Sequence, residues 1–199
     1  MRKIVAVVVA MISAVAVSAQ TTAQEWLTML SASLGDRYAM HIEVSMDDEP
    51  MEGYFMVDGD GYYITLGVME VYSDGKLRHE VNNERKEVAV DGVDLTSVDL
   101  LTNPTKAFDF VGDEFAVSIV ECDAKVCVLS LVPRDDAMGV SAIGVTLVRD
   151  GSGVVPRSIS YDYDGVRVDI ATRIADADTR VLPRWKKDDY RGYDIVSFL

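Results

Sequence analysis

The chain has 199 residues, of which 49% are hydrophobic, 8% aromatic and 26% charged. This composition is too apolar for a disordered chain and predicts a packed core. An excess of 33 acidic over 19 basic residues gives a formal net charge of −14, which argues against general binding to nucleic-acid phosphates or anionic surfaces. Two histidines and two cysteines are too few ligands for a typical zinc site, and we expect no metal and no cofactor.

The first residues are typical of a secretory signal peptide. Arg2 and Lys3 precede an apolar run of about 14 residues that ends at Val17, and Ser18 and Ala19 complete a small-residue cleavage site. A membrane anchor is the alternative, but spanning a bilayer takes about 20 apolar residues. We therefore expect residues 1–19 to be a signal peptide cleaved after Ala19 and residues 20–199 to form a single exported domain. Cleavage removes two basic residues and no acid, which lowers the net charge to −16.

Periodicity predicts one helix followed by strands. Apolar residues recur every three or four positions over Gln24–Leu34, which indicates an amphipathic helix that Gly35 ends. After the helix, alternating apolar and polar residues with short turns between the runs predict strands. These strands are expected at Tyr38–Met46, Met51–Val57, Tyr62–Leu66, Met69–Tyr72, Leu77–Val81, Glu87–Val90, Phe115–Glu121, Val126–Val132, Ser141–Val148, Val155–Tyr163 and Val166–Ile174.

Two segments depart from this rhythm. Between Asp91 and Val111 the pattern favours short helices or a partly helical loop, and residues 195–199 could add an edge strand. About eleven strands at short spacing predict a mainly β fold with a large antiparallel sheet, open or barrel-like. Cys122 and Cys127 end two neighbouring runs and are expected to face each other across a hairpin, where either a disulfide or two free thiols fit the sequence.

The sequence lacks the motifs of the common enzyme classes. It contains no nucleophile elbow, no phosphate-binding Gly-rich loop and no Ser, Lys and His set at catalytic spacing, so we expect no enzyme. The segment Asp58-Gly59-Asp60-Gly61 resembles the start of a calcium loop, but later positions lack oxygen ligands, which favours a plain turn.

Apolar residues exceed what the few predicted helices could cover. A sheet of this size must bury one face, and incomplete covering would leave a cavity whose methionines form a deformable wall. The candidate lipid-binding residues that would line this cavity are Trp26, Leu30, Met40, Ile42, Val44, Phe55, Val57, Tyr63, Leu101 and Phe108. The alternative is that all of them are ordinary core residues.

The order of elements resembles a known family. The relevant features are the signal peptide, the single helix, the strand segment Gly53-Tyr54-Phe55-Met56-Val57, the turn Ser73-Asp74-Gly75-Lys76 and the helical interruption. Together they are similar to the periplasmic outer-membrane lipoprotein carriers, the LolA-like proteins. The resemblance implies a strongly curved, unclosed antiparallel sheet, a half-barrel whose concave face is covered by the N-terminal helix and the short middle helices.

The same resemblance implies a periplasmic monomer that holds the acyl chains of a lipoprotein, or of a similar lipid, during sorting to the outer membrane. The implied partners are an inner-membrane release complex and an outer-membrane acceptor. Burial of acyl CH₂ groups, each worth about 0.8 kcal/mol, would give affinity without catalytic residues. A non-catalytic exported interaction module of the cell envelope, with a fully packed core, is the alternative function.

The sequence departs from this family after the second predicted strand. The family's carriers commonly place a basic residue and a proline there, and the basic side chain ties down the lid. This chain has Asp58, Gly59 and Asp60 instead. The candidate replacements for the basic residue are Arg78, Arg85 and Lys106.

Overall fold

The computed structural model describes residues 23–46, 49–94, 104–105, 115–134, 140–151, 153–163, 165–176 and 181–199. The chain divides into two compact units. Unit 1 comprises the residues up to Ser33 together with Phe110–Val166, and unit 2 comprises Leu34–Asp109 and Arg167–Leu199. The predicted signal peptide and most of the segment between Asp91 and Val111 lie outside the described residues.

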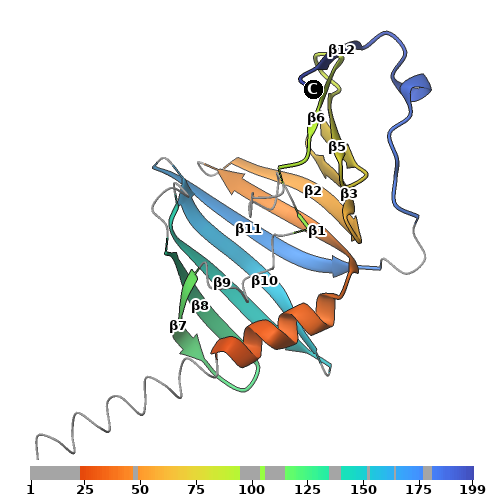
Figure 1. The fold of residues 1–199 in the computed structure, drawn as a ribbon. Helices are drawn as coiled ribbons and strands as arrows, with labels where there is room; N and C mark the ends of the chain where they lie inside the picture. The colour runs from red at the N-terminus through yellow and green to blue at the C-terminus, as the bar shows by residue number, and fades with distance from the viewer. Residues whose placement is uncertain are drawn as a thin grey trace, which may run out of the picture. The chain divides into compact units, whose positions relative to one another are not determined.

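The fold is mainly β, as the sequence predicted, with twelve strands and one α-helix, over residues 23–34, in the described part of the chain (Figure 1). The hydrogen-bonded strand order is β12-β6-β5-β4-β3-β2-β1-β11-β10-β9-β8-β7. Because β12 and β7 stand at the two ends of this order, the sheet is open. The ends of the eleven predicted strands lie within two residues of the observed ends.

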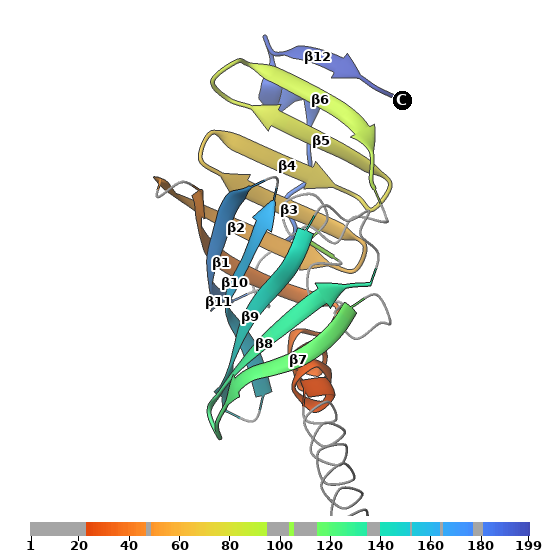
Figure 2. The ribbon, with the colours of Figure 1, turned by 90° about the vertical axis from the view of Figure 1, so that its left-hand side faces the viewer.

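The described residues of unit 2 form eight strands and one short 3-10 helix. Their bounds are β1 (Arg37–Met46), β2 (Glu49–Asp58), β3 (Gly61–Leu66), β4 (Met69–Ser73), β5 (Leu77–Asn82), β6 (Glu87–Gly92), β11 (Val166–Ala175), η2 (Lys187–Tyr190) and β12 (Asp194–Ser197). Figure 2 shows β2 to β6 and β12 side by side. Tight turns join β2 to β3 and β3 to β4, where Gly59 and Gly67 adopt φ values of 58° and 56° that side chains disfavour.

The eleven predicted strands form an antiparallel sheet, as expected, and the added edge strand β12 is the exception. β12 is the edge strand that residues 195–199 were expected to add, but it pairs with β6 in parallel, with Ile195 opposite Val88. The chain reaches β6 through η2 and a segment that crosses the other strands of unit 2. It therefore arrives at the sheet edge running in the same direction as β6, which a hairpin connection could not achieve.

Unit 1 is an antiparallel sheet with a helix packed on it. Its strands are β7 (Phe115–Cys122), β8 (Val126–Pro133), β9 (Val140–Asp150) and β10 (Gly153–Tyr163). A disulfide joins Cys122 to Cys127, which face each other across the β7–β8 hairpin. The helix ends before Gly35, whose φ of 60° suits the left-handed cap expected there.

Candidate functional site

One face of the unit 2 sheet is apolar across four strands. The antiparallel register places side chains of β1 to β6 directly opposite one another, in rows that cross the sheet. We name this side of the sheet the apolar face. Its three rows, from β1 to β6, are Tyr38-Val57-Tyr62-Ser73-Arg78-Asp91, Met40-Phe55-Ile64-Val71-Glu80-Ala89 and Ile42-Gly53-Leu66-Met69-Asn82-Glu87.

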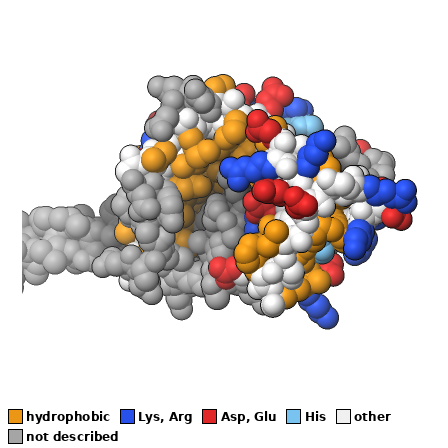
Figure 3. All heavy atoms as spheres, turned by 90° about the horizontal axis from the view of Figure 1, so that it is seen from above, with side chains coloured by type: hydrophobic (Ala, Val, Ile, Leu, Met, Phe, Trp, Pro, Cys, Tyr) orange, Lys and Arg blue, Asp and Glu red, His pale blue; other side chains and the backbone are white. Residues whose placement is uncertain are grey.

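The middle row shows how completely this face is buried. Met40 and Phe55 are 0% exposed, Ile64 is 3% exposed and Val71 is 5% exposed. Row members on β1 to β4 are apolar except Ser73, whereas five of the six members on β5 and β6 are polar or charged. The face therefore changes from apolar to polar within a single sheet. Figure 3 shows hydrophobic side chains bordered by acidic and basic side chains on the side of the molecule seen from above.

Tyr38 places a polar group at the β1 end of the first row. Its ring packs edge-on against Phe55, with ring centroids 5.9 Å apart. The buried hydroxyl donates a hydrogen bond of 2.7 Å to the carbonyl oxygen of Pro104. Burial raises the pKa of Tyr38 well above its usual value, so the hydroxyl stays protonated and acts as a donor throughout the physiological range.

Five of the ten predicted cavity residues share the apolar face. Met40, Ile42 and Val44 alternate along β1, and Phe55 and Val57 lie on β2 beside them. Tyr63 does not join them, because it pairs with Met56 and Tyr72 on the opposite face. Its neighbour Tyr62 occupies the apolar face instead and is 0% exposed.

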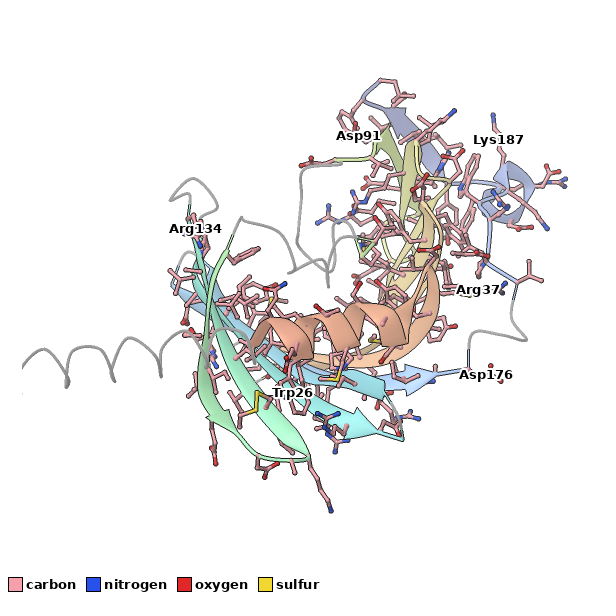
Figure 4. The ribbon with its side chains drawn as sticks, turned by 60° about the horizontal axis from the view of Figure 1, so that its bottom comes forward. Trp26, Arg37, Asp91, Arg134, Asp176 and Lys187 are labelled. Atoms are coloured by element: carbon pink, nitrogen blue, oxygen red, sulfur yellow. A yellow bond between two sulfur atoms is a disulfide. The ribbon has the colours of Figure 1, made fainter. Side chains whose placement is uncertain are left out.

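Trp26 and Leu30 belong to the helix, where the described contacts are with the unit 1 sheet. Trp26 lies under the guanidinium of Arg149 at 4.7 Å from the ring centroid, and the Ser33 hydroxyl accepts a hydrogen bond of 2.8 Å from the Val154 amide. Both predicted residues are buried, with Trp26 drawn between the helix and the strands in Figure 4. The last two, Leu101 and Phe108, lie outside the described residues.

The opposite face of unit 2 is covered by the chain itself. We name residues 181–193 the strap and the side of the sheet beneath it the strap face. Leu182 packs on Ala39 and Met56, and the Trp185 ring stacks on His79 with centroids 4.3 Å apart. Figure 4 shows Lys187 in the same segment, on the turn η2. Local periodicity does not predict this covering, although one tryptophan and two tyrosines lie within nine positions of the strap.

Glu70 on β4 is the polar centre of the strap face. Its carboxylate accepts hydrogen bonds from the hydroxyls of Tyr63, Tyr72 and Tyr190 and from the Asn83 amide. Burial alone would raise the pKa of Glu70, but these four hydrogen bonds hold it below its ordinary value. Burial also raises the pKa of Tyr63 to about 12.

The three candidate basic residues differ in position. Arg78 projects from β5 onto the apolar face, opposite Ser73 and Asp91. Arg85 lies exposed in the turn between β5 and β6, and Lys106 is outside the described residues.

Among the described residues, no three His, Cys, Asp or Glu side chains gather to hold a metal. No helix in that part of the chain has the length and apolarity needed to cross a membrane.

Comparisons with known proteins identify structural relatives at low sequence identity. No protein-family model matches the sequence, and no curated protein matches it. An uncharacterized conserved protein from Thermus thermophilus superposes with a TM-score of 0.58 at 8% identity, over 88% of this chain and 99% of that chain. At this identity the similarity is evidence of a shared fold alone.

Two further solved structures have lower scores. LprF from Mycobacterium bovis has a TM-score of 0.47 at 12% identity, over 82% of this chain and 97% of that chain. A putative outer membrane lipoprotein-sorting protein domain from Vibrio parahaemolyticus has a TM-score of 0.45 at 11% identity, over 88% and 97%.

Proposed function

We propose that this protein is an exported, non-enzymatic carrier that holds lipid acyl chains against the apolar face of unit 2. The observation that carries the proposal is the continuity of the rows, which are apolar from β1 to β4 apart from Ser73. The strap covers the other face of the same strands. The apolar face is therefore the side of these strands that the strap leaves to a ligand, and it must open to admit one because its middle row is at most 5% exposed. Flexible Met side chains on that face suit chains of variable shape.

The affinity of such a surface comes from the hydrophobic effect. About ten buried CH₂ groups correspond to about 8 kcal/mol, from which the cost of ordering the ligand is subtracted. No reacting group is required, which fits the lack of catalytic motifs in the sequence. The sequence resemblance adds the finer proposal that the chains belong to a lipoprotein in transit to the outer membrane, received from an inner-membrane release complex and passed to an outer-membrane acceptor.

Two methionines provide a matched test. Met40 and Met56 are both 0% exposed and lie on neighbouring strands, Met40 on the apolar face and Met56 on the strap face. Gln in place of either methionine buries an amide and should lower the free energy of unfolding by about 1–3 kcal/mol. We expect Met40→Gln to weaken the binding of a fluorescent acyl probe to delipidated protein at least fivefold, whereas Met56→Gln leaves it unchanged.

The control for folding is the thermal unfolding of both variants, which should change by similar amounts. Saturable binding that an acylated peptide displaces supports the carrier. Equal binding by both variants, or no binding by the wild type, contradicts it.

The location is also a proposal. We propose that residues 1–19 are removed during export to the periplasm and that residues 20–199 act as a monomer. The mass of the protein recovered from the periplasm tests this directly, because cleavage after Ala19 leaves Gln20 as the first residue.

A second function is favoured by the edge of unit 2. β12 exposes Ile195 and Val196, with 40% and 49% of each side chain in contact with solvent. An interaction module that docks a cell-envelope partner on this edge needs no acyl chain. It predicts no probe binding by the wild type, together with loss of a captured partner when Val196 becomes Lys.

A further inference from the structure

The apolar rows end at a charged pair on β5. Arg78 and Glu80 project from the same side of this strand, and the Arg78 Nη2 atom lies 2.6 Å from the Glu80 Oε2 atom. Their side chains are 23% and 34% exposed, so the pair lies between the buried rows and solvent. Asp91 on β6 stands directly opposite Arg78.

The Arg78 guanidinium has donor capacity that the pair does not use. Its Nε atom is buried and has no hydrogen-bond partner among the described residues. A guanidinium carries five N–H donors in a planar fork that matches phosphate oxygens. A buried donor without a partner is costly, and a ligand oxygen that reached it would remove this cost.

The charges around Arg78 specify more than a simple anion. Glu80 and Asp91 place two carboxylates beside one cation, and the Tyr62 hydroxyl accepts a further hydrogen bond from Arg78. A head group with negative charge alone would meet Arg78 but would be repelled by the carboxylates. A head group that carries both a phosphate and an ammonium would complement both signs.

We propose that Arg78 and Glu80 bind the head group of a zwitterionic phospholipid, with phosphate on Arg78 and ammonium on Glu80, while its acyl chains lie along the apolar face. This inference rests on the proposed carrier function and names a phospholipid, in place of a lipoprotein, as the ligand. It also fixes the orientation of the ligand on the apolar face: the head group lies at the β5 end, toward solvent, and the acyl chains lie toward β1.

The test uses delipidated wild-type protein loaded with a fluorescent acyl probe. Three competitors with matched dihexanoyl chains are compared: phosphatidylethanolamine, phosphatidylglycerol and diacylglycerol. We expect phosphatidylethanolamine to displace the probe at about tenfold lower concentration than the other two, as a charge-assisted hydrogen bond to a buried donor would give. Phosphoethanolamine without chains should not displace the probe at these concentrations.

Variants of the pair distinguish ligand binding from a structural salt bridge. Arg78→Gln should abolish the preference for phosphatidylethanolamine and leave displacement by diacylglycerol unchanged. Glu80→Gln should instead shift the preference toward phosphatidylglycerol, because it removes the repulsion of an anionic head group. Arg85→Gln, in the exposed turn nearby, is the matched control and should change nothing.

The outcomes separate this inference from the function on which it rests. Absence of probe binding by the wild type overturns both. Probe binding without a head-group preference, a preference for the anionic lipid, or a preference that survives Arg78→Gln overturns the zwitterionic site alone. Thermal unfolding of each variant shows whether the fold is retained, and displacement by diacylglycerol shows whether the apolar face is intact.

Discussion

Glu70 is a half-buried carboxylate on which three tyrosine hydroxyls and one asparagine amide converge. Its hydrogen bond to the Asn83 Nδ2 atom is 2.7 Å long, and its bond to the Tyr190 hydroxyl is 3.2 Å long. The Tyr190 hydroxyl also lies 2.8 Å from that of Tyr72. One charged side chain thus joins β4, the turn after β5 and the strap, and its charge state is coupled to the attachment of the strap.

Replacing Glu70 by Gln tests this coupling. We expect a loss of about 1–3 kcal/mol in the free energy of unfolding at neutral pH, because a charged acceptor becomes a neutral one. The pKa of Glu70 is lowered in the folded protein from 4.5, so its contribution is complete above pH 4.5 and is lost as the pH falls through the folded value. Urea unfolding across a pH series should therefore show the two proteins converging in acid.

Glu84→Gln in the exposed turn is the control for this pH series and should follow the wild type. Burial lowers the pKa of His79 on the same face, so some loss of stability below pH 6.5 should remain in Glu70→Gln. A difference in the free energy of unfolding between wild type and Glu70→Gln that stays constant at every pH would contradict a stabilising role for the Glu70 charge.

Gly53 occupies a position on the apolar face where no side chain fits. A Cβ atom built there would lie 2.5 Å from the carbonyl oxygen of Thr65 and 3.0 Å from the Cγ1 atom of Ile42. The glycine in the Gly-x-Phe-x-Val segment, on which the sequence resemblance partly rests, therefore has a packing reason. It permits the close approach of β2 to the row members on either side.

Gly53→Ala should lower the free energy of unfolding by about 1–3 kcal/mol through overpacking. Gly92→Ala is the matched control, since a Cβ atom there has nothing within 4 Å and the φ angle is not positive. That substitution should change stability by less than about 0.5 kcal/mol. Chemical denaturation of the two variants measures the difference, and equal effects would mean that the close approach relaxes without cost.

At this scale the candidates on β1 and β2 share the apolar face, whereas on β3 the register places Tyr62 there and the candidate Tyr63 on the strap face. Alternation along β1 identified Met40, Ile42 and Val44 because His41 and Glu43 mark the other face. On β3, Tyr62 and Tyr63 are consecutive aromatic residues that point to opposite faces. The residue types alone could therefore not decide which of the two lies on the apolar face. The two-residue turn at Gly59 and Asp60 fixes the register and puts Tyr62 on the apolar face.

Among the elements, the strap was the hardest to predict. Its contacts join residues more than a hundred positions apart, such as Tyr193 and Asn83, whose side chains hydrogen-bond at 3.0 Å. Local periodicity contains no information on such pairs. The strand at residues 195–199 could be anticipated from its apolar run, but its parallel direction depends on the path of the strap across the sheet.

Trp185 is the largest side chain of the strap, and its removal should loosen the whole element. It stacks on His79 and packs beside Val81, Val88 and Val90. We expect Trp185→Ala to lower the free energy of unfolding by about 2 kcal/mol, less than for a fully buried Trp because the ring is only partly covered. Hydrogen exchange of the β6 amides should accelerate, because β12 is held against this edge by the strap.

Val181→Ala is the control for that experiment. The Val181 side chain is 87% exposed, so its truncation should leave both stability and exchange unchanged. Unchanged exchange on β6 in Trp185→Ala would mean that β12 pairs independently of the strap.

Across the whole molecule, the two units cover their sheets by different means. In unit 1 the N-terminal helix contacts the sheet through Trp26 and Ser33, and its Trp26, Leu27 and Leu30 side chains are at most 3% exposed. In unit 2 the strap covers the strap face. Among the described residues, no α-helix that belongs to unit 2 covers its apolar face. Strand count and the single helix could be predicted from local patterns. The division into units could not, because β11 and the strap join β1 to β6 from the far end of the sequence.

Net charge acts on the molecule as a whole. With 33 acidic and 19 basic residues, the folded chain concentrates negative charge that the unfolded chain spreads over a larger volume. Raising the ionic strength screens this repulsion, since the Debye length falls from about 30 Å at 0.01 M to about 3 Å at 1 M. We expect the Tm to rise by about 2–5 °C between 0.01 M and 0.5 M sodium chloride. A variant in which the exposed acids Glu84, Glu87, Asp188 and Asp189 are converted to their amides should show a smaller rise of Tm with salt. A wild-type Tm that is constant or falls with salt would show that local ion pairs outweigh the net repulsion.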